Sequence, residues 1–144
     1  MHIGFYLETS GGTPENLKIY EALNEAVDNN DVTDASIFYN NVDFNPAQIK
    51  FGMFNSADIW SFTGTLVATS LNNVSRASNI VNKFNLAYLY SPISQGVSEI
   101  FELIGISGKV PILAKNQEDA DEVYRLTAQK PIVLKKFSAK EILE

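Results

Sequence analysis

Polar residues suited to holding a small anionic ligand recur just after the apolar runs of this sequence of 144 residues. Glycines and a hydroxyl follow the first run, and amides or hydroxyls follow four later runs. Such groups suit a phosphate or a carboxylate, above all where a helix begins and its amides are free. The candidate ligand-binding residues are Gly11, Gly12, Thr13, Asn40, Thr69, Ser70, Ser91 and Asn116.

Candidates for acid–base catalysis are few. The chain has one histidine and no cysteine, so disulfides, thiolate metal sites and cysteine nucleophiles are excluded. The histidine, His2, begins the first apolar run and is expected at the edge opposite the ligand. Carboxylates such as Glu8 and Asp43 remain, and Glu8 is the better placed because it ends that run beside the glycines. No metal-ligand cluster stands out, and neither a metal nor a cofactor is expected.

Each candidate also has a purely structural explanation. Gly11 and Gly12 can serve only to permit positive φ in a tight turn. The segment TSGGTP lacks the lysine of a P-loop and the spacing of GxGxxG. Thr13, Ser70 and Asn116 are adequately explained as helix caps, and Glu8 as a polar strand end. Both explanations remain open for these residues.

The apolar runs predict strands, and the segments between them predict helices with one apolar face. Pro14 suits the first position of a helix, Gly105 suits a left-handed helix end, and Ser138 with Glu141 forms a capping box. The expected strands are 2–7, 35–39, 58–62, 66–69, 86–90, 110–114 and 132–134, with an edge strand near 49–54 in a long loop, 42–56. The expected helices begin near residues 14, 71, 94, 117 and 139.

Buried positions can be predicted from the same periodicity. Trp60 is expected in the core with the other aromatic residues. The expected buried stripes are Leu17, Tyr20, Leu23 and Val27 in the first helix, Leu71, Val74, Ala77 or Ser78 and Val81 in the second, and Val97, Ile100, Phe101 and Ile104 in the third.

Strands that alternate with helices at this spacing indicate an α/β protein with a doubly wound, mostly parallel, Rossmann-like sheet and helices on both faces. We expect a single domain over residues 1–144. Ligands of such sheets lie outside the carboxyl ends of the strands, near the switch in strand order. The polar loops listed above would therefore meet at one edge.

Charge and hydropathy exclude some classes of protein. The net charge of −6 makes nucleic-acid binding unlikely. Acids outnumber bases by eight to two in residues 1–50, whereas bases outnumber acids by seven to six in residues 109–144, so an anionic ligand is better tolerated by the last third. No apolar run approaches the roughly 20 residues that span a bilayer. We expect a soluble, cytoplasmic protein that does not enter a membrane.

Five segments in this order carry a family resemblance: GFYLETSGG, WSFTGTLVATSLNNVSRASNIV, NLAYLYS, VPILAKNQEDADEVYRL and PIVLKKFSAKEIL. The chain resembles small glycosyltransferase-like proteins encoded by T4-type phages of marine cyanobacteria. These look like the N-terminal Rossmann-like half of a GT-B glycosyltransferase. The resemblance covers nearly the whole chain, and it implies that the protein acts in the cytoplasm of an infected host cell.

The resemblance has specific implications for the site. GT-B enzymes close two Rossmann-like domains over a cleft, and the C-terminal domain holds most of the nucleotide-sugar donor. Gly11 and Gly12 match the loop that faces the cleft in such enzymes. Tyr90-Ser91-Pro92 replaces the acidic, tryptophan-bearing strand end of the phage relatives, which puts a shared catalytic role in doubt.

Three functions are compatible with these features. The first is a non-enzymatic half-domain that binds a nucleotide, a sugar phosphate or a partner protein. The second is a glycosyltransferase that acts on a nucleotide-sugar only as a homo-oligomer or with a second chain. The third is a structural or assembly protein, whose contacts would be the last helix and the 42–56 loop.

Overall fold

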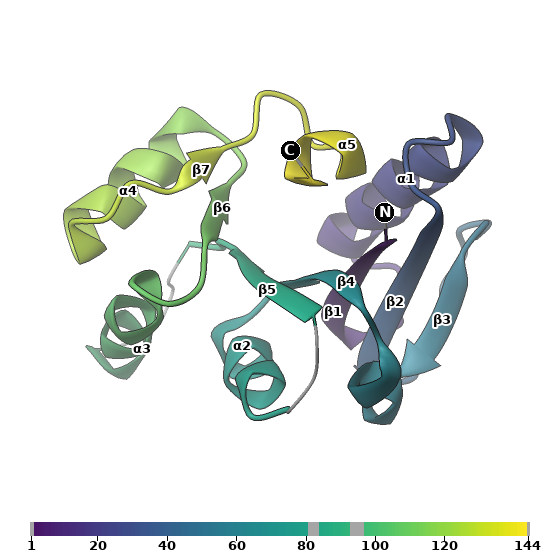
Figure 1. Ribbon diagram of the computed structural model, residues 1–144, viewed down its shortest axis with the longest axis horizontal. Helices are drawn as coiled ribbons and strands as arrows, with labels where there is room; N and C mark the ends of the chain where they lie inside the picture. Colours follow the sequence, from purple (N-terminus) through teal and green to yellow (C-terminus); the bar gives the residue numbers. More distant parts are fainter. Residues whose placement is uncertain (1, 81–83, 93–96, 144) are drawn as a thin grey trace.

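The computed structural model describes residues 2–80, 84–92 and 97–143, and its centre is a seven-stranded sheet (Figure 1). The strand order is β3-β2-β1-β4-β5-β6-β7, and each of these neighbouring pairs is parallel. This confirms an α/β, doubly wound, Rossmann-like fold. The strands are β1 (His2–Thr9), β2 (Asp34–Asn41), β3 (Gly52–Asn55), β4 (Gly64–Ala68), β5 (Phe84–Leu89), β6 (Ile112–Ala114) and β7 (Ile132–Val133).

Strand β1 is the strand from which the sheet is built in both directions. The chain first moves outward through β2 to β3, then returns to pair β4 with the other side of β1 and continues to β7. The strand order therefore reverses between β1 and β4. In open parallel sheets this reversal separates the two loops that follow the strands and leaves a crevice between them.

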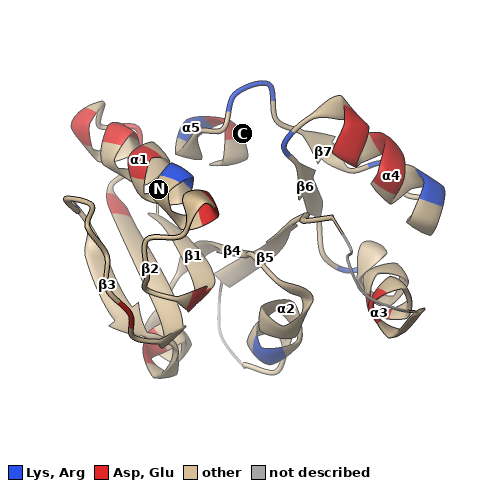
Figure 2. Ribbon diagram, turned by 180° about the vertical axis from the view of Figure 1, so that it is seen from behind, with Lys and Arg blue, Asp and Glu red and all other residues tan. Residues whose placement is uncertain are grey.

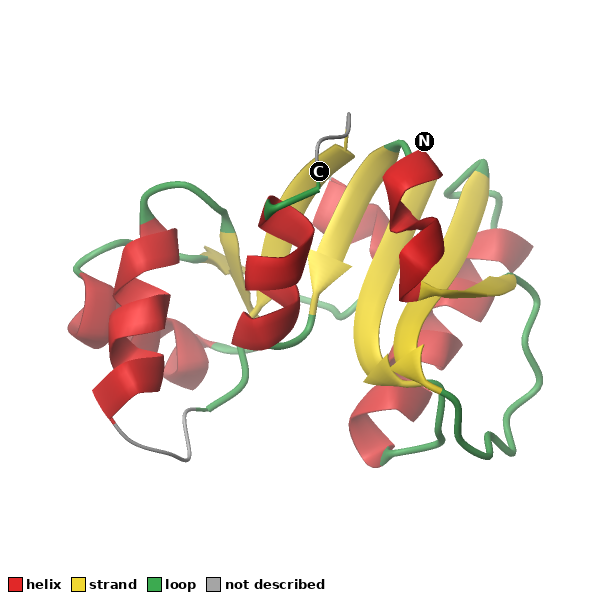
Figure 3. Ribbon diagram, turned by 90° about the horizontal axis from the view of Figure 1, so that it is seen from below, coloured by secondary structure: helices red, strands yellow, loops and turns green. Residues whose placement is uncertain are grey.

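Helices cover both faces of the sheet (Figures 1 and 3). Side chains alternate along β1, so Ile3, Phe5 and Leu7 pack in the cluster that contains α1 and α5, whereas Tyr6 packs in the cluster of η1 and α2. A third cluster joins α2, α3 and α4 to β5 and β6. The helices are α1 (Pro14–Asp28), the 3₁₀ helix η1 (Ser56–Ser61), α2 (Leu71–Ser78), α3 (Val97–Ser107), α4 (Gln117–Thr127) and α5 (Ala139–Leu143).

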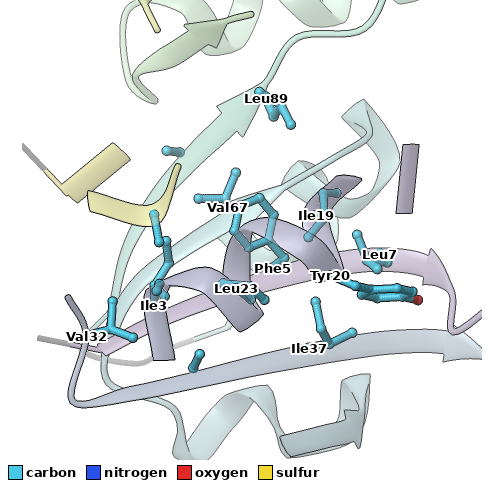
Figure 4. Packing of buried hydrophobic residues seen from close by; sticks show 14 of the residues in the cluster. Ile3, Phe5, Leu7, Ile19, Tyr20, Leu23, Val32, Ile37, Val67 and Leu89 are labelled. Atoms are coloured by element: carbon cyan, nitrogen blue, oxygen red, sulfur yellow. The ribbon is translucent and has the colours of Figure 1, made fainter. Parts of the chain in front are cut away.

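The largest core cluster packs the first and last parts of the chain together (Figure 4). The rings of Phe5 and Phe137 meet edge to face with centroids 6.3 Å apart. Lys136 pairs with Glu25 of α1 at 3.0 Å, and Ala139 of α5 is buried in the same cluster. The segment that leads into α5 therefore covers β1 beside α1.

The predicted helix caps are confirmed. The side-chain oxygens of Thr13, Ser70 and Asn116 accept hydrogen bonds from the amides of residues 16, 73 and 119, at 3.2, 3.2 and 2.7 Å. The capping box is half formed, because Ser138 Oγ accepts from the Glu141 amide at 3.2 Å. The Glu141 carboxylate does not return to the cap, and accepts instead from the amides of Lys135 and Lys136.

The strand predicted at residues 58–62 is wrong, because this segment forms the 3₁₀ helix η1. Asn55 Oδ1 accepts from the Ala57 amide at 2.9 Å and starts a helical turn, which ends with the Phe62 amide donating to Ile59 O. A three-residue repeat turns Ile59 and Phe62 inward. Trp60 then points outward and is 68% exposed, so its predicted core position is also wrong.

Two predicted stripes are rotated relative to the observed packing. Leu17 is exposed, and α1 buries Ile19, Ala22 and Ala26 beside the correctly predicted Tyr20 and Leu23. In α3, Val97, Phe101 and Ile104 are exposed, Ile100 is half-buried and Leu103 is buried, so most of that stripe faces away from the core. Gly105 lies inside α3 and does not cap it. Val81 and the predicted helix start at residue 94 lie outside the described residues.

Gly64 is the one described glycine whose backbone requires its residue type. Its φ is +128°, and an added Cβ would lie 2.5 Å from His2 O.

Among the helices that the structure describes, none is long and apolar enough to cross a membrane.

Candidate functional site

A cavity of about 400 Å³ opens at the carboxyl ends of the strands, at the switch between β1 and β4. Loops after β1, β4, β5 and β6 form its floor, and α1 and the segment before α5 form its walls. Its volume is within the usual range for small-molecule sites. The lining residues are Glu8, Thr9, Thr13, Glu15, Asn16, Lys18, Ile19, Thr69, Ser70, Leu89, Ser91, Lys115 and Phe137.

The cavity brings together about half of the residues predicted from sequence. Thr13, Thr69, Ser70 and Ser91 line it, as does Glu8. The remaining candidates, Gly11, Gly12, Asn40 and Asn116, are not among its lining residues. Binding by any of them stays a prediction.

The glycine turn is closed against the segment 43–46, which explains its composition. An added Cβ on Gly12 would lie 2.6 Å from Pro46 Cδ, and one on Gly11 would lie 3.2 Å from Asp43. Neither glycine has positive φ, so the explanation from backbone freedom is wrong and close approach replaces it. The Gly12 amide donates to Phe44 O at 3.1 Å and the Gly11 amide to Thr9 Oγ1 at 3.1 Å. The amides that a phosphate-binding loop would offer are therefore already used.

Two side chains of α1 hold the same turn from inside the protein. Asn16 Nδ2 donates to Thr9 O at 3.1 Å and to Gly11 O at 3.0 Å. The Tyr20 hydroxyl lies 3.0 Å from both Ser10 O and Gly11 O, and burial raises its pKa above the ordinary 10.0. The turn is thus held in place between Thr9 and Thr13, which line the cavity.

Glu8 is held at the edge of the cavity by two amides of β2. Asn40 Nδ2 donates to Glu8 Oε2 at 3.0 Å, and Asn41 Nδ2 donates to Glu8 Oε1 at 3.2 Å. The Tyr6 hydroxyl donates to Asn40 Oδ1 at 2.7 Å and fixes the orientation of that amide. A carboxylate has about four lone-pair positions, so Glu8 can still accept hydrogen bonds from hydroxyl groups of a ligand.

Asn73 connects this network to α2, and sequence reasoning missed it. Its side chain is fully buried, donates to Tyr6 O at 3.1 Å, and accepts from Asn40 Nδ2 at 3.1 Å. Its backbone amide donates to the Ser70 cap. Asn40 therefore supports the site from behind without lining it. From sequence, an asparagine in the first turn of a helix is expected at the surface, and only the packing shows that Asn73 is buried.

Lys18 and Lys115 bring positive charge to the cavity from different elements. Lys18 projects from α1 and Lys115 follows β6, and both side chains are exposed. The ion pairs within the described part of the chain join Lys50 to Asp28 and Lys136 to Glu25, and include neither of these lysines. Burial raises the pKa of the Asp119 carboxyl, and Lys115 lies near enough to counteract this shift. Glu8 and Glu15 line the same cavity as the two lysines.

A second cavity of about 400 Å³ adjoins the first and shares Thr69, Ser70 and Ser91 with it. Its far wall is acidic, with Glu99 and Glu102 of α3. Tyr88 also lines it. Burial raises the Tyr88 pKa above its ordinary 10.0, a hydrogen bond with the Ser91 backbone opposes this shift, and the nearby Glu99 adds to it. The two cavities meet at the N-terminus of α2.

No group of three His, Cys, Asp or Glu residues that could hold a metal ion occurs among the residues described. His2 lies at the start of β1, at the sheet edge opposite the cavities.

No protein-family model matches this chain, and comparison with curated proteins and with solved structures found no match either.

Proposed function

We propose that this chain binds a small phosphorylated molecule with free hydroxyl groups, a nucleotide or a sugar phosphate, without changing it chemically. The observation that carries the proposal is the first cavity, which combines Lys18 and Lys115 with the fixed carboxylate of Glu8. Ammonium groups suit a phosphate, and a carboxylate accepts hydrogen bonds from hydroxyls. Ile19 and Leu89 add an apolar wall for a ring.

The expected position of the phosphate is near Ser70. Ser70 caps α2 and lies where both cavities meet, so the positive end of the helix dipole faces them. The start of α1 is less suitable, because Pro14, its first residue, has no amide hydrogen to offer a phosphate. Lys18 and Lys115 would then contact the phosphate from either side.

Binding is favoured over catalysis by the composition of the cavity. None of its lining residues is a histidine or a cysteine, and the hydroxyls present are those of threonines and serines. The Ser70 hydroxyl oxygen accepts from Asn73 N, and the Thr69 hydroxyl donates to Tyr6 O. A serine or threonine nucleophile activated by an adjacent base is thus not assembled from the hydroxyls of Thr69 and Ser70.

The test is a titration followed by amide NMR shifts. The probes are glucose 1-phosphate, adenosine and uridine monophosphates, and a uridine diphosphate sugar, the last chosen because of the resemblance to glycosyltransferase-like proteins. At least one of these three classes of probe should shift the amide signals of Thr69 and Ser70. An exposed charge contributes up to about 1 kcal/mol, so Lys18→Ala and Lys115→Ala should each weaken binding up to about fivefold. The exposed Lys140 is outside the cavity lining, and Lys140→Ala should leave affinity unchanged.

Several outcomes would contradict the proposal. One is that no probe shifts any amide near the cavity. Another is that Lys140→Ala weakens binding as much as Lys18→Ala does, which would indicate nonspecific attraction. Sugar transfer or donor hydrolysis, assayed in the same samples, would show that the chain is an enzyme and would favour the glycosyltransferase hypothesis.

A further inference from the structure

Helix α3 presents an apolar stripe to solvent on the face opposite its buried side. Val97, Phe101 and Ile104 are 65%, 67% and 42% exposed, and their spacing of four and three residues places them on one face. Leu103, on the other side, is fully buried in the core cluster with α2 and α4. Large apolar side chains grouped in this way mark an interaction surface more often than an isolated one does.

The same stripe ends in two glycines that leave space beside it. An added Cβ on Gly105 or on Gly108 would meet no atom within 4 Å. One further turn follows the end of α3 at Ser107, and in it the amides of Lys109 and Val110 both donate to Ile106 O, at 2.9 and 2.8 Å. The stripe therefore has a bulky first half and a flat second half.

A row of charged residues runs along one side of the stripe. Glu102 follows Phe101 within α3, and Lys109 follows Gly108 in the turn after α3, so each charge is next to a residue of the stripe and the two lie seven residues apart. The acidic end of this row is beside the bulky half and its basic end is beside the flat half. Along the stripe the surface thus changes from bulky and acidic to flat and basic.

We propose that this face binds the same face of a second copy of the chain, with the two α3 helices antiparallel. A two-fold axis makes every contact twice, so a surface can pair with itself only if its two halves are complementary. An antiparallel register that sets Phe101 against Gly108 also sets Ile104 against Gly105. The same register brings Glu102 within reach of Lys109 of the other copy.

Alternative arrangements lose these matches. A parallel pair would set Phe101 against Phe101 and Gly108 against Gly108, so the bulky halves would conflict and the flat halves would leave a gap. Helix α3 lies at the outer margin of the molecule, beside α4, so a second copy can approach it (Figure 2). The inference does not depend on the proposed ligand, although Glu102 also lines the second cavity. In the dimer, Lys109 of the other copy would lie near that acidic wall.

The experiment is sedimentation velocity on the full chain over a range of concentrations. A small helix–helix interface should give a weak dimer, so the concentrations should extend from about 5 µM to about 500 µM. The wild-type chain should shift from monomer to dimer. Phe101→Glu should remain monomeric throughout, whereas Trp60→Glu, which alters a side chain of almost equal exposure (68% against 67%), should dimerise as the wild type does.

Charge exchange tests the register itself. Lys109→Glu should weaken the dimer, because it places two acids together in each of the two symmetric contacts. The double variant Glu102→Lys with Lys109→Glu should restore it. The inference is wrong if the wild-type chain stays monomeric at the highest concentration, if Phe101→Glu and Trp60→Glu behave alike, or if the double variant is no better than the single one. Circular dichroism on each variant confirms that these exposed substitutions leave the fold intact.

Discussion

Two asparagines of α1 offer a matched test of what holds the glycine turn in place. Asn16 and Asn24 each make two hydrogen bonds from the side chain to the backbone of a loop. Asn16 is buried, at 8% exposure, whereas the bonds of Asn24 to Gln48 and Lys50 are exposed. Both residues lie in the same helix, so replacing either with alanine raises helix propensity equally, and this effect cancels when the two variants are compared.

The expected cost of Asn16→Ala follows from its two contacts. Each buried hydrogen bond contributes about 1 kcal/mol net, and a buried carbonyl left without a partner costs about 1–3 kcal/mol. Gly11 O retains a hydrogen bond from the Tyr20 hydroxyl, and Thr9 O, whose bond to Asn16 is only partly buried, can be reached by water from the cavity. The total is therefore about 2 kcal/mol, from two hydrogen bonds of about 1 kcal/mol each. Asn24→Ala should cost about 0.5 kcal/mol or less, because water replaces both exposed bonds.

Urea unfolding followed by circular dichroism measures this difference. With an m-value of about 2 kcal/mol/M, the midpoint should fall by about 1 M in Asn16→Ala and by about 0.25 M or less in Asn24→Ala. Hydrogen exchange adds a local readout, because the amides of Gly11 and Gly12 should exchange faster in the first variant alone. Equal midpoint shifts in the two variants would refute the idea that buried Asn16 fastens the turn.

Gly64→Ala should destabilise the protein by about 2–4 kcal/mol in urea unfolding, since φ of +128° and the 2.5 Å approach to His2 O both exclude a side chain. Its ligand affinity should be unchanged, because Gly64 lies at the other edge of the sheet. Burial raises the pKa of Tyr88 above 10.0, so the folded chain holds that proton more tightly than the unfolded chain does, and stability should fall as the pH rises through about 10. Tyr88→Phe should lessen this loss in urea titrations at about pH 8 and pH 11, and Tyr20, whose pKa is also raised, should retain part of it. Trp60 is the only tryptophan and is 68% exposed, so acrylamide should quench the native fluorescence nearly as well as the unfolded fluorescence, and strong protection would contradict its position.

The parts of the fold that sequence predicts well depend on signals between near neighbours. Threonine, serine and asparagine are favoured caps in front of a helical segment, and Thr13, Ser70 and Asn116 are such caps. The apolar run of β1 likewise indicates a strand that is buried on both faces. The wrong predictions concern which way a segment faces. Trp60 and Phe101 are apolar enough to be assigned to a core, and only the positions of distant elements leave them in solvent.

In the site, too, some features follow from local sequence and others depend on distant elements. Thr13, Thr69, Ser70 and Ser91 meet because parallel strands end at one edge, which a sequence can indicate. The hydrogen bond from the Gly12 amide to Phe44 O could not be predicted, since nothing in TSGGTP specifies its partner. Lys115 and Phe137 reach the cavity through the order of the last strands, which periodicity does not encode.

The packing of Phe137 on Phe5 has a consequence for synthesis on the ribosome. Translation makes β1 first, but the side chains that cover it beside α1 come from the segment that leads into α5. A growing chain therefore carries an incompletely covered apolar strand until the segment around Phe137 has been added. Nascent chains that stop before this segment should recruit chaperones, and this part of the core should form only when α5 has left the exit tunnel.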